Sequence, residues 1–413
     1  MRLTNIHSVT TGMKLGEPIF GPAGQILLQR GVCLSNKYIT SLRDMGFPAV
    51  YIDDGDTSDI AVPHAIAPET RARVLRNLAE AFDSVSSATD SFRASSRHTA
   101  MEHLQSERFA KAVATVARDG GFDRLFDDVN GMLDQLLVHD VLVGMNSIKT
   151  HDKYTFQHSI DVTVMGLMLA KKVGWGRARL KEFAIGCILH DIGKIFIDPV
   201  ILNKPGPLTE EEFRLMKQHP QVGHDLIRAI APASGFLVPQ VALQHHERED
   251  GSGYPRKLHG DGSLGAHQNG GVHEFGALSA VADVYDALTS DRPYRAGWTP
   301  ERAVQLITSM SGVHFNRQAV RAFVEVVAPF PLCSDVRILR GRYAGHVGIV
   351  ADIGEAALDR PKVRLLFDPF GKRIDPVEID LAVERDVNIV ALTVAESTAL
   401  ANTHSNLPQR LSA

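Results

Sequence analysis

The sequence predicts a mainly helical, multidomain protein in which an all-α domain is flanked by two small β-rich modules. Three observations predict this class. Gly and β-branched residues are frequent in residues 1–60, marked helix starts fill 68–330, and short strand-like runs return after 331. At 413 residues the chain is long enough for two to three domains. We expect a β module over 1–60, a helical connector over 68–145, the main helical domain over 150–330, a β appendage over 331–392 and a flexible tail over 393–413.

Composition excludes several classes of protein. Lys and Arg number 44 against 48 Asp and Glu, so bulk positive charge for binding duplex nucleic acid is missing. The three cysteines are far apart and form no CxxC pair, which argues against a disulfide framework and a thiolate zinc site. With no signal peptide and no apolar stretch of about 20 residues, we expect a cytoplasmic protein that does not enter membranes.

The first module combines turns, one helix and a strand. Turn residues occur at 21–24, a helix is expected near 35–45, and AVYID at 49–53 has strand character. Asp53 and Asp54 are interpreted as turn carboxylates. A phospho-acceptor receiver domain would need alternating strands and helices, which are missing here.

Two apolar stripes at helical spacing mark the connector. One comprises Val74, Leu75, Leu78, Phe82 and Val85, and the other comprises Phe122, Leu125, Phe126, Val129, Met132, Leu133, Leu136 and Leu137. These stripes are suited to pack against each other, against the main domain, or against a second copy of the chain. A homodimer is therefore one hypothesis.

Clear helix starts identify the main domain as all-α. Thr209 followed by Glu212 predicts a capping box, and Thr299-Pro300-Glu301 places a cap, a first-turn proline and an acidic residue in order. After 331 the runs VRIL, HVGIVADI and KVRLLFD, separated by Gly, Asp and Pro, predict strands.

Ten of the 18 histidines fall between His151 and His273. Seven side chains stand out because apolar neighbours would bury them: His158, His190, Asp191, His219, His245, His246 and Asp283. Burying imidazoles and carboxylates together is costly unless a cation offsets their desolvation. One metal with room left for water cannot use seven ligands, whereas two metals bridged by a carboxylate can. Zinc, manganese, iron and nickel all accept nitrogen and oxygen ligands of this kind.

A structural role is the alternative for any single histidine. We interpret His151-Asp152 as solvated, because polar residues surround it. The remaining histidines of this part of the chain lie in loops or lack apolar flanks, so we expect structural or exposed roles for His224, His259, His267, His273 and His314.

Taken in chain order, the motifs resemble a known family. They are His158-Ser159, His190-Asp191-Ile192-Gly193-Lys194, His219-Pro220, His245-His246-Glu247, Asp250-Gly251-Ser252-Gly253-Tyr254-Pro255 and ADVYDALTSDRPYR over 282–295. This series resembles the HD-GYP domain, a subgroup of the HD phosphohydrolase superfamily, over residues 150–330. Residues 1–60 resemble the small β domain that often precedes it. The resemblance implies a cyclic di-GMP phosphodiesterase that forms linear pGpG, and in some members GMP, in the signalling that controls motility and biofilm.

The resemblance also implies roles for individual residues. The seven buried side chains would be the metal ligands, with Asp191 as the bridge, and Lys194 would lie near the scissile phosphate. Gly253, Tyr254 and Pro255 would shape the pocket. Arg292 and Arg295 would face the phosphates, where guanidinium groups bind oxygen atoms in pairs. The alternative for these arginines is a surface ion pair with Asp286 or Asp291.

Three departures from the family pattern affect these expectations. Members with a third metal carry a glutamate four residues before the first histidine, where this chain has Tyr154. We therefore expect two divalent metals and linear pGpG, with the further step to GMP left open. Fe or Mn is expected before Ni or Zn. The segment 259–275 is longer than the family's usual connection, and we interpret it as a lid, a gate or a disordered loop. Ala277 stands where the family usually has an arginine.

Two other functions stay open. A signalling adaptor would keep the fold and bind diguanylate cyclases or other signalling proteins, although it would have no need of seven aligned ligands. A hydrolase could instead act on cyclic GMP-AMP or on a dNTP.

Overall fold

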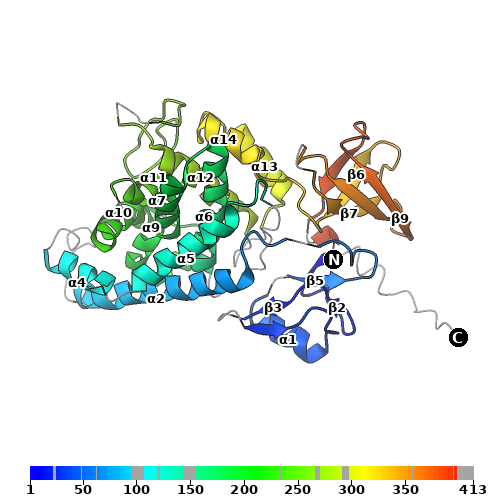
Figure 1. Ribbon diagram of the computed structural model, residues 1–413, viewed down its shortest axis with the longest axis horizontal. Coiled ribbons are helices and arrows are strands. Elements are labelled where there is room, and N and C mark those ends of the chain that lie inside the picture. The colour runs from blue at the N-terminus through cyan, green and yellow to red at the C-terminus, as the bar shows by residue number, and fades with distance from the viewer. Residues whose placement is uncertain are drawn as a thin grey trace.

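The computed structural model describes residues 1–413 except 22–24, 48, 62, 95–106, 119–120, 143–153, 233–234, 266–269, 291–296, 355–356, 394 and 398–413. A helical body lies beside two small β modules, one from each end of the chain (Figure 1). This arrangement confirms the predicted fold class. Among the described residues, no helix combines the length and apolar character needed to span a bilayer.

The N-terminal module is a small antiparallel sheet with one helix. β1 (Arg2–Asn5), β5 (Ala49–Asp53) and β2 (Lys14–Leu15) pair in the order β1-β5-β2, and β3 (Ile19–Phe20) pairs with β4 (Ile26–Leu28). Helix α1 (Asn36–Asp44) begins after Ser35, whose hydroxyl accepts a hydrogen bond from the Tyr38 N–H. The predicted helix near 35–45 and strand at 49–53 are confirmed.

Three connector helices cover one side of the helical body: α2 (Pro68–Ala94), α4 (Glu107–Arg118) and α5 (Gly121–Leu136). The two predicted stripes are buried in the same core as the main domain, where α2 packs on α5 and α6, and α5 packs on α6 and α7. The stripes are therefore covered within one chain, and they do not support a homodimer.

The main domain consists of packed helices, as predicted. Its elements are α6 (Tyr154–Val173), α7 (Arg177–Ile188), the 3₁₀ helix η2 (Ile192–Phe196), α8 (Pro199–Leu202), α9 (Glu210–Met216), α10 (His219–Ile230), α11 (Val238–Gln244), α12 (Glu274–Thr289), α13 (Pro300–Ser309) and α14 (Arg317–Val324). Thr209 and Glu212 form the predicted capping box, and Thr299 caps α13.

A five-stranded antiparallel sheet forms the C-terminal module. It comprises β6 (Asp335–Arg340), β7 (Val347–Asp352), β8 (Lys362–Phe367), β9 (Arg373–Asp380) and β10 (Asn388–Ala391), in the order β10-β6-β7-β8-β9. The sequence analysis predicted β6, β7 and β8 and did not predict the two edge strands. β9 carries Pro376, which has no N–H to donate and is therefore confined to an edge strand, and only one of its residues is buried.

The two β modules share one hydrophobic cluster. Met1 and Tyr51 from the first module pack with Val347 and Phe367 of the second. Arg364 donates hydrogen bonds of 2.6 and 2.7 Å to the Asp59 carboxylate, and Arg2 pairs with Asp335 at 3.0 Å. The modules therefore form one β unit, a contact that the sequence analysis did not predict.

Candidate metal centre

The ends of several helices bring the seven predicted side chains together. His158 lies on α6, His190 and Asp191 join α7 to η2, and His219 begins α10. His245 and His246 follow α11, and Asp283 lies in α12. All are buried except His246, whose side chain is 23% exposed.

Glycines allow the helices to approach closely enough for this arrangement. A Cβ atom at Gly193 would lie 2.1 Å from the His219 carbonyl oxygen and 2.7 Å from the Gly223 nitrogen. A Cβ atom at Gly186 would lie 2.4 Å from Val241 Cγ2. The first contact holds the start of α10 against η2, and the second holds α11 against α7. Both fix histidine-bearing segments.

Asp191 lies at the middle of the cluster. Its oxygens are 3.5 Å from His190 Nε2, 3.5 Å from His219 Nε2 and 3.8 Å from His245 Nε2. Asp283 approaches His158 Nε2 at 3.1 Å and His246 Nδ1 at 3.7 Å. Three groups of ligand atoms within 4.8 Å of one another result: His219, His245 and His246; His158, His190 and Asp283; His190, Asp191 and His245.

The other ring nitrogens fix how these imidazoles point. Nδ1 of His190, His219 and His245 donates to the carbonyls of Cys187, Met216 and Ala242 at 2.7, 2.8 and 2.9 Å. A ring that donates through Nδ1 keeps the lone pair of Nε2 free, and in each case Nε2 faces the cluster. The backbone thus selects the tautomer that binds metals.

The donor set fits divalent cations. His190 Nε2 and Asp191 Oδ1 are buried and have no hydrogen-bond partner among the described residues. Buried polar atoms rarely remain unpaired, and a cation between them would satisfy both. Burial lowers the pKa of His190 to about 4 and that of His219 to about 3, so both rings are neutral near pH 7.

Both carboxylates stay ionised despite burial. Burial raises the pKa of Asp191, but the Lys194 ammonium, 2.5 Å from Oδ2, holds that pKa well below its usual range. Burial likewise opposes ionisation of Asp283, and the hydrogen bond to His158 holds its pKa below the ordinary value. The site therefore offers negative oxygen donors together with the neutral nitrogen donors of His190 and His219, which zinc, manganese, iron and nickel all accept.

Asp286 is a residue of this site whose role there was not predicted from the sequence. It was considered as a surface partner for arginines, yet it is 1% exposed and its Oδ2 lies 2.7 Å from His158 Nδ1. Burial lowers the pKa of His158, but the carboxylates of Asp283 and Asp286 outweigh burial and raise it to about 10. The spacing of Asp283 and Asp286, one turn apart on an apolar helix, was the available signal.

The Gly253-Tyr254-Pro255 loop covers one side of the cluster. The Tyr254 ring stacks on His246 with centroids 4.7 Å apart. A Cβ atom at Gly253 would lie 2.6 Å from the His246 carbonyl oxygen, so the loop can follow this path only with glycine. The buried Glu247 carboxylate accepts hydrogen bonds from the Arg256 and Leu258 N–H groups at 2.6 and 2.9 Å, which fixes the loop.

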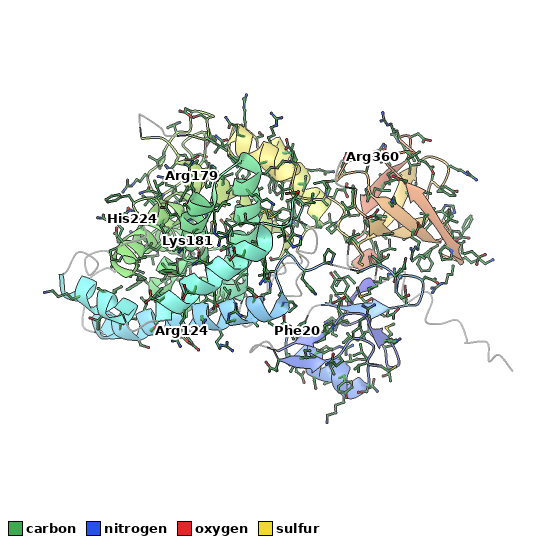
Figure 2. The ribbon with its side chains drawn as sticks, viewed as in Figure 1. Phe20, Arg124, Arg179, Lys181, His224 and Arg360 are labelled. Carbon is green, nitrogen blue, oxygen red and sulfur yellow. The ribbon has the colours of Figure 1, made fainter. Side chains whose placement is uncertain are left out.

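Several predicted residues lie away from the cluster or outside the described residues. His224 lies on α10 (Figure 2) and pairs with Asp225, and His273 caps α12, so their structural interpretation is confirmed. The sites that fall outside the described residues are Arg292, Arg295, His151, Asp152, His267 and 266–269 of the longer segment. Residues 260 and 262 of that segment donate backbone hydrogen bonds to Glu249.

Comparisons with known proteins agree with this geometry. The family model described as HD domain matches residues 143–319. The chain is 34% identical over 290 residues to Cyclic di-GMP phosphodiesterase PA4108 of Pseudomonas aeruginosa, covering 68% of this chain and 66% of that protein. It is 36% identical over 188 residues to a cyclic di-GMP phosphodiesterase of Thermotoga maritima, covering 45% of this chain and 49% of that protein.

Relatives with a different named substrate also match. The chain is 30% identical over 202 residues to 3'3'-cGAMP-specific phosphodiesterase 2 of Vibrio cholerae, covering 48% of this chain and 37% of that protein. The chain spans less than two thirds of the length of these three relatives. The HD-domain match, these relatives and the buried His/Asp clusters together show that the chain belongs to the HD-GYP family of HD-domain proteins.

Proposed function

We propose that the protein is a metal-dependent phosphodiesterase that hydrolyses cyclic di-GMP to linear pGpG. The observation that carries this proposal is the buried cluster, in which His190, His219 and His245 turn Nε2 toward the ionised Asp191 carboxylate. Two of its polar atoms have no hydrogen-bond partner among the described residues. The names of the relatives support a cyclic dinucleotide as the substrate.

The proposed ligands are His158, His190, Asp191, His219, His245, His246 and Asp283, with Asp191 as the bridge. Two divalent cations, Fe or Mn before Ni or Zn, would supply Lewis acidity and an activated water at neutral pH. The backbone carbonyls that fix the histidine tautomers remove the need for reorientation when the site is loaded.

Lys194 is proposed to act on the phosphate. Its ammonium holds Asp191 through one N–H, and its side chain is 24% exposed, so further donors remain for a phosphate oxygen. In that position it would stabilise charge that develops during in-line displacement. Arg292 and Arg295 are proposed as further phosphate contacts on the resemblance alone.

Tyr254 is proposed to form the pocket wall beside the reacting phosphate. Its ring covers His246 and leaves one face for a base or ribose. Gly253 and Pro255 would set the path of this wall. Because the wall reduces access of water to the cluster, it would strengthen electrostatic interactions there.

The test is anaerobic incubation of the purified protein with cyclic di-GMP and each of Mn, Fe, Ni and Zn, with products followed by chromatography and metal content measured per chain. We expect pGpG together with about two metals per chain. His190→Ala and Asp191→Ala should lose both metal and turnover, whereas His224→Ala, on α10 outside the cluster, should keep both. Retained turnover in either cluster variant would refute the assignment.

Cyclic GMP-AMP is a second candidate substrate, because a relative named for it matches half of the chain. Including it in the same assay at equal concentration decides between the two by their kcat/KM values. Loaded metal with no product from either nucleotide would favour an adaptor that binds diguanylate cyclases or other signalling proteins.

A further inference from the structure

A groove with basic and aromatic walls lies beside the candidate metal centre. Its volume is about 510 Å³, which is within the range of small-molecule sites. Its lining residues are Phe213, Arg214, Lys217, Arg248, Ser252, Gly253, Tyr254, Pro255 and Lys257. Helix α9 and the residues just after it form one wall, and the loop after α11 forms the other.

A short series of rings lies between the groove and the cluster. Tyr254 stacks on His246 with centroids 4.7 Å apart, and Phe213 meets Tyr254 edge-on with centroids 6.1 Å apart. The ring of His246 belongs to the cluster, so the groove begins one ring away from the ligands. A molecule that is bound at the cluster and is large enough to pass Tyr254 would reach the groove.

An exposed aromatic ring and several cationic side chains line this space. Phe213 is 43% exposed although it is a large apolar side chain. Lys217 Nζ lies 4.4 Å from the centre of the Phe213 ring. In the described part of the chain, Lys217, Arg248 and Lys257 form no ion pair, whereas Arg214 is paired with Glu211. The lining contains no acidic residue. The groove therefore suits an anionic ligand that carries a flat ring.

We infer that this groove binds the half of the cyclic dinucleotide that is not cleaved. This inference rests on the proposed function. A cyclic dinucleotide carries two phosphates and two bases, and only one phosphodiester can react at the cluster in a given encounter. The second base would lie against Phe213, because every base offers a face for stacking. The second phosphate would accept hydrogen bonds from Lys217 and Arg248.

The test uses Phe213→Leu and Lys217→Gln, two changes at partly exposed positions. Because each change removes one stacked base or one charged contact, we expect KM for cyclic di-GMP to rise about tenfold, with kcat within twofold. The Kd of linear pGpG, measured by calorimetry, should rise by a similar factor. Hydrolysis of bis(p-nitrophenyl) phosphate, which has no second half, should keep its rate.

Lys181→Gln is the matched control. Lys181 is an exposed cation on α7 that does not line the groove (Figure 2), so all three readouts should match the wild type. Unchanged KM and Kd in both groove variants, with a wild type that makes pGpG, would overturn the groove assignment and leave the proposed function standing. A parallel loss of bis(p-nitrophenyl) phosphate hydrolysis would also overturn it, because the variants would then act on the cluster.

A wild type that fails to hydrolyse cyclic di-GMP refutes the proposed function instead. The Kd of the intact cyclic nucleotide can then be measured directly for each variant. An increase of about tenfold would support the groove as its binding site, and equal Kd values or no binding would overturn that assignment.

Discussion

Asp286 holds the imidazole of His158 by Nδ1, which leaves Nε2 facing Asp283 at 3.1 Å. Asp286→Asn removes the charge from this contact while keeping its size. Because groups that orient a ligand support its basicity, we expect metal affinity to fall about 10–100-fold. Metal content after dialysis against buffered Mn²⁺ or Zn²⁺ measures the effect. Ser290→Ala removes a weaker hydrogen bond of 3.3 Å to the same carboxylate and should have a smaller effect. Equal affinity of Asp286→Asn and wild type would contradict this role.

Glycine is required at position 193 because two backbone segments pack closely there, and not because the residue takes part in metal binding or catalysis. In Gly193→Ala the new methyl group would meet backbone atoms of His219 and Gly223, which can yield only if α10 moves. We expect a loss of about 1–3 kcal/mol in the free energy of unfolding, together with lower metal content. Urea unfolding and metal analysis check both.

Gly176→Ala is the control for the Gly193 substitution. Gly176 precedes α7 with φ of −74°, and no atom lies within 4 Å of its added methyl group. Wild-type stability in Gly193→Ala would show that α10 can move without cost.

The sequence identified the seven side chains of the cluster because each is a polar residue in or next to a helix with apolar neighbours, where burial needs a reason. It did not identify the role of Asp286, because the residue one turn before it on the same helix already accounted for a buried carboxylate. The contacts that fix the histidine tautomers could not be predicted either. Their acceptors are backbone carbonyls, and every residue has one.

At the scale of elements, a buried ion pair joins the connector to the helix that carries His158. Arg71 of α2 pairs with Asp161 of α6, which is fully buried one turn after His158. Arg71→Met would remove this cation from the buried carboxylate, so we expect the free energy of unfolding to fall by about 3 kcal/mol. Urea denaturation measures the change.

Arg76→Met is the matched control, since Arg76 is exposed on the same helix. A loss below about 0.5 kcal/mol is expected for this surface change. Equal effects of the two substitutions would mean that the ion pair contributes nothing beyond surface charge.

Elements with strong local signals were predicted well, and those defined by their neighbours were not. Thr209 and Thr299 mark helix starts through side-chain hydrogen bonds to nearby N–H groups, so the signal lies within four residues. The edge strands β9 and β10 depend on pairing with β8 and β6. Few side chains of β9 are buried, and β10 is short. Such strands carry little alternation for a sequence pattern to show.

At the scale of the whole molecule, contacts between the two β modules are electrostatic at their rim. The hydrogen bond from Arg364 lowers the pKa of Asp59 from 3.8 to about 2. The stabilisation from this depressed pKa is fully present above pH 3.8 and is lost as the pH falls through about 2. Asp59→Asn should therefore cost at most about 1 kcal/mol at pH 6, and the difference from wild type should shrink as the pH approaches 2.

Unfolding free energies of wild type and Asp59→Asn between pH 6 and pH 2 check this prediction. The same measurement in 1 M salt is the control, because high ionic strength screens exposed charges and should reduce the difference at pH 6. A difference that grows on acidification would have the wrong sign for this ion pair.

The shared core of the two β modules also restricts how the molecule can move. The chain leaves the β unit near Ile60, passes through every helix of the main domain, and returns to the unit at Cys333. Glu301 of α13 accepts a hydrogen bond from the Ala391 N–H of β10, which adds a contact near the return point. A body tethered at one point can swing in all directions, whereas one tethered at two points can only turn about the line that joins them. We therefore expect rigid-body motion of the β unit relative to the helices to be restricted to rotation about that single axis.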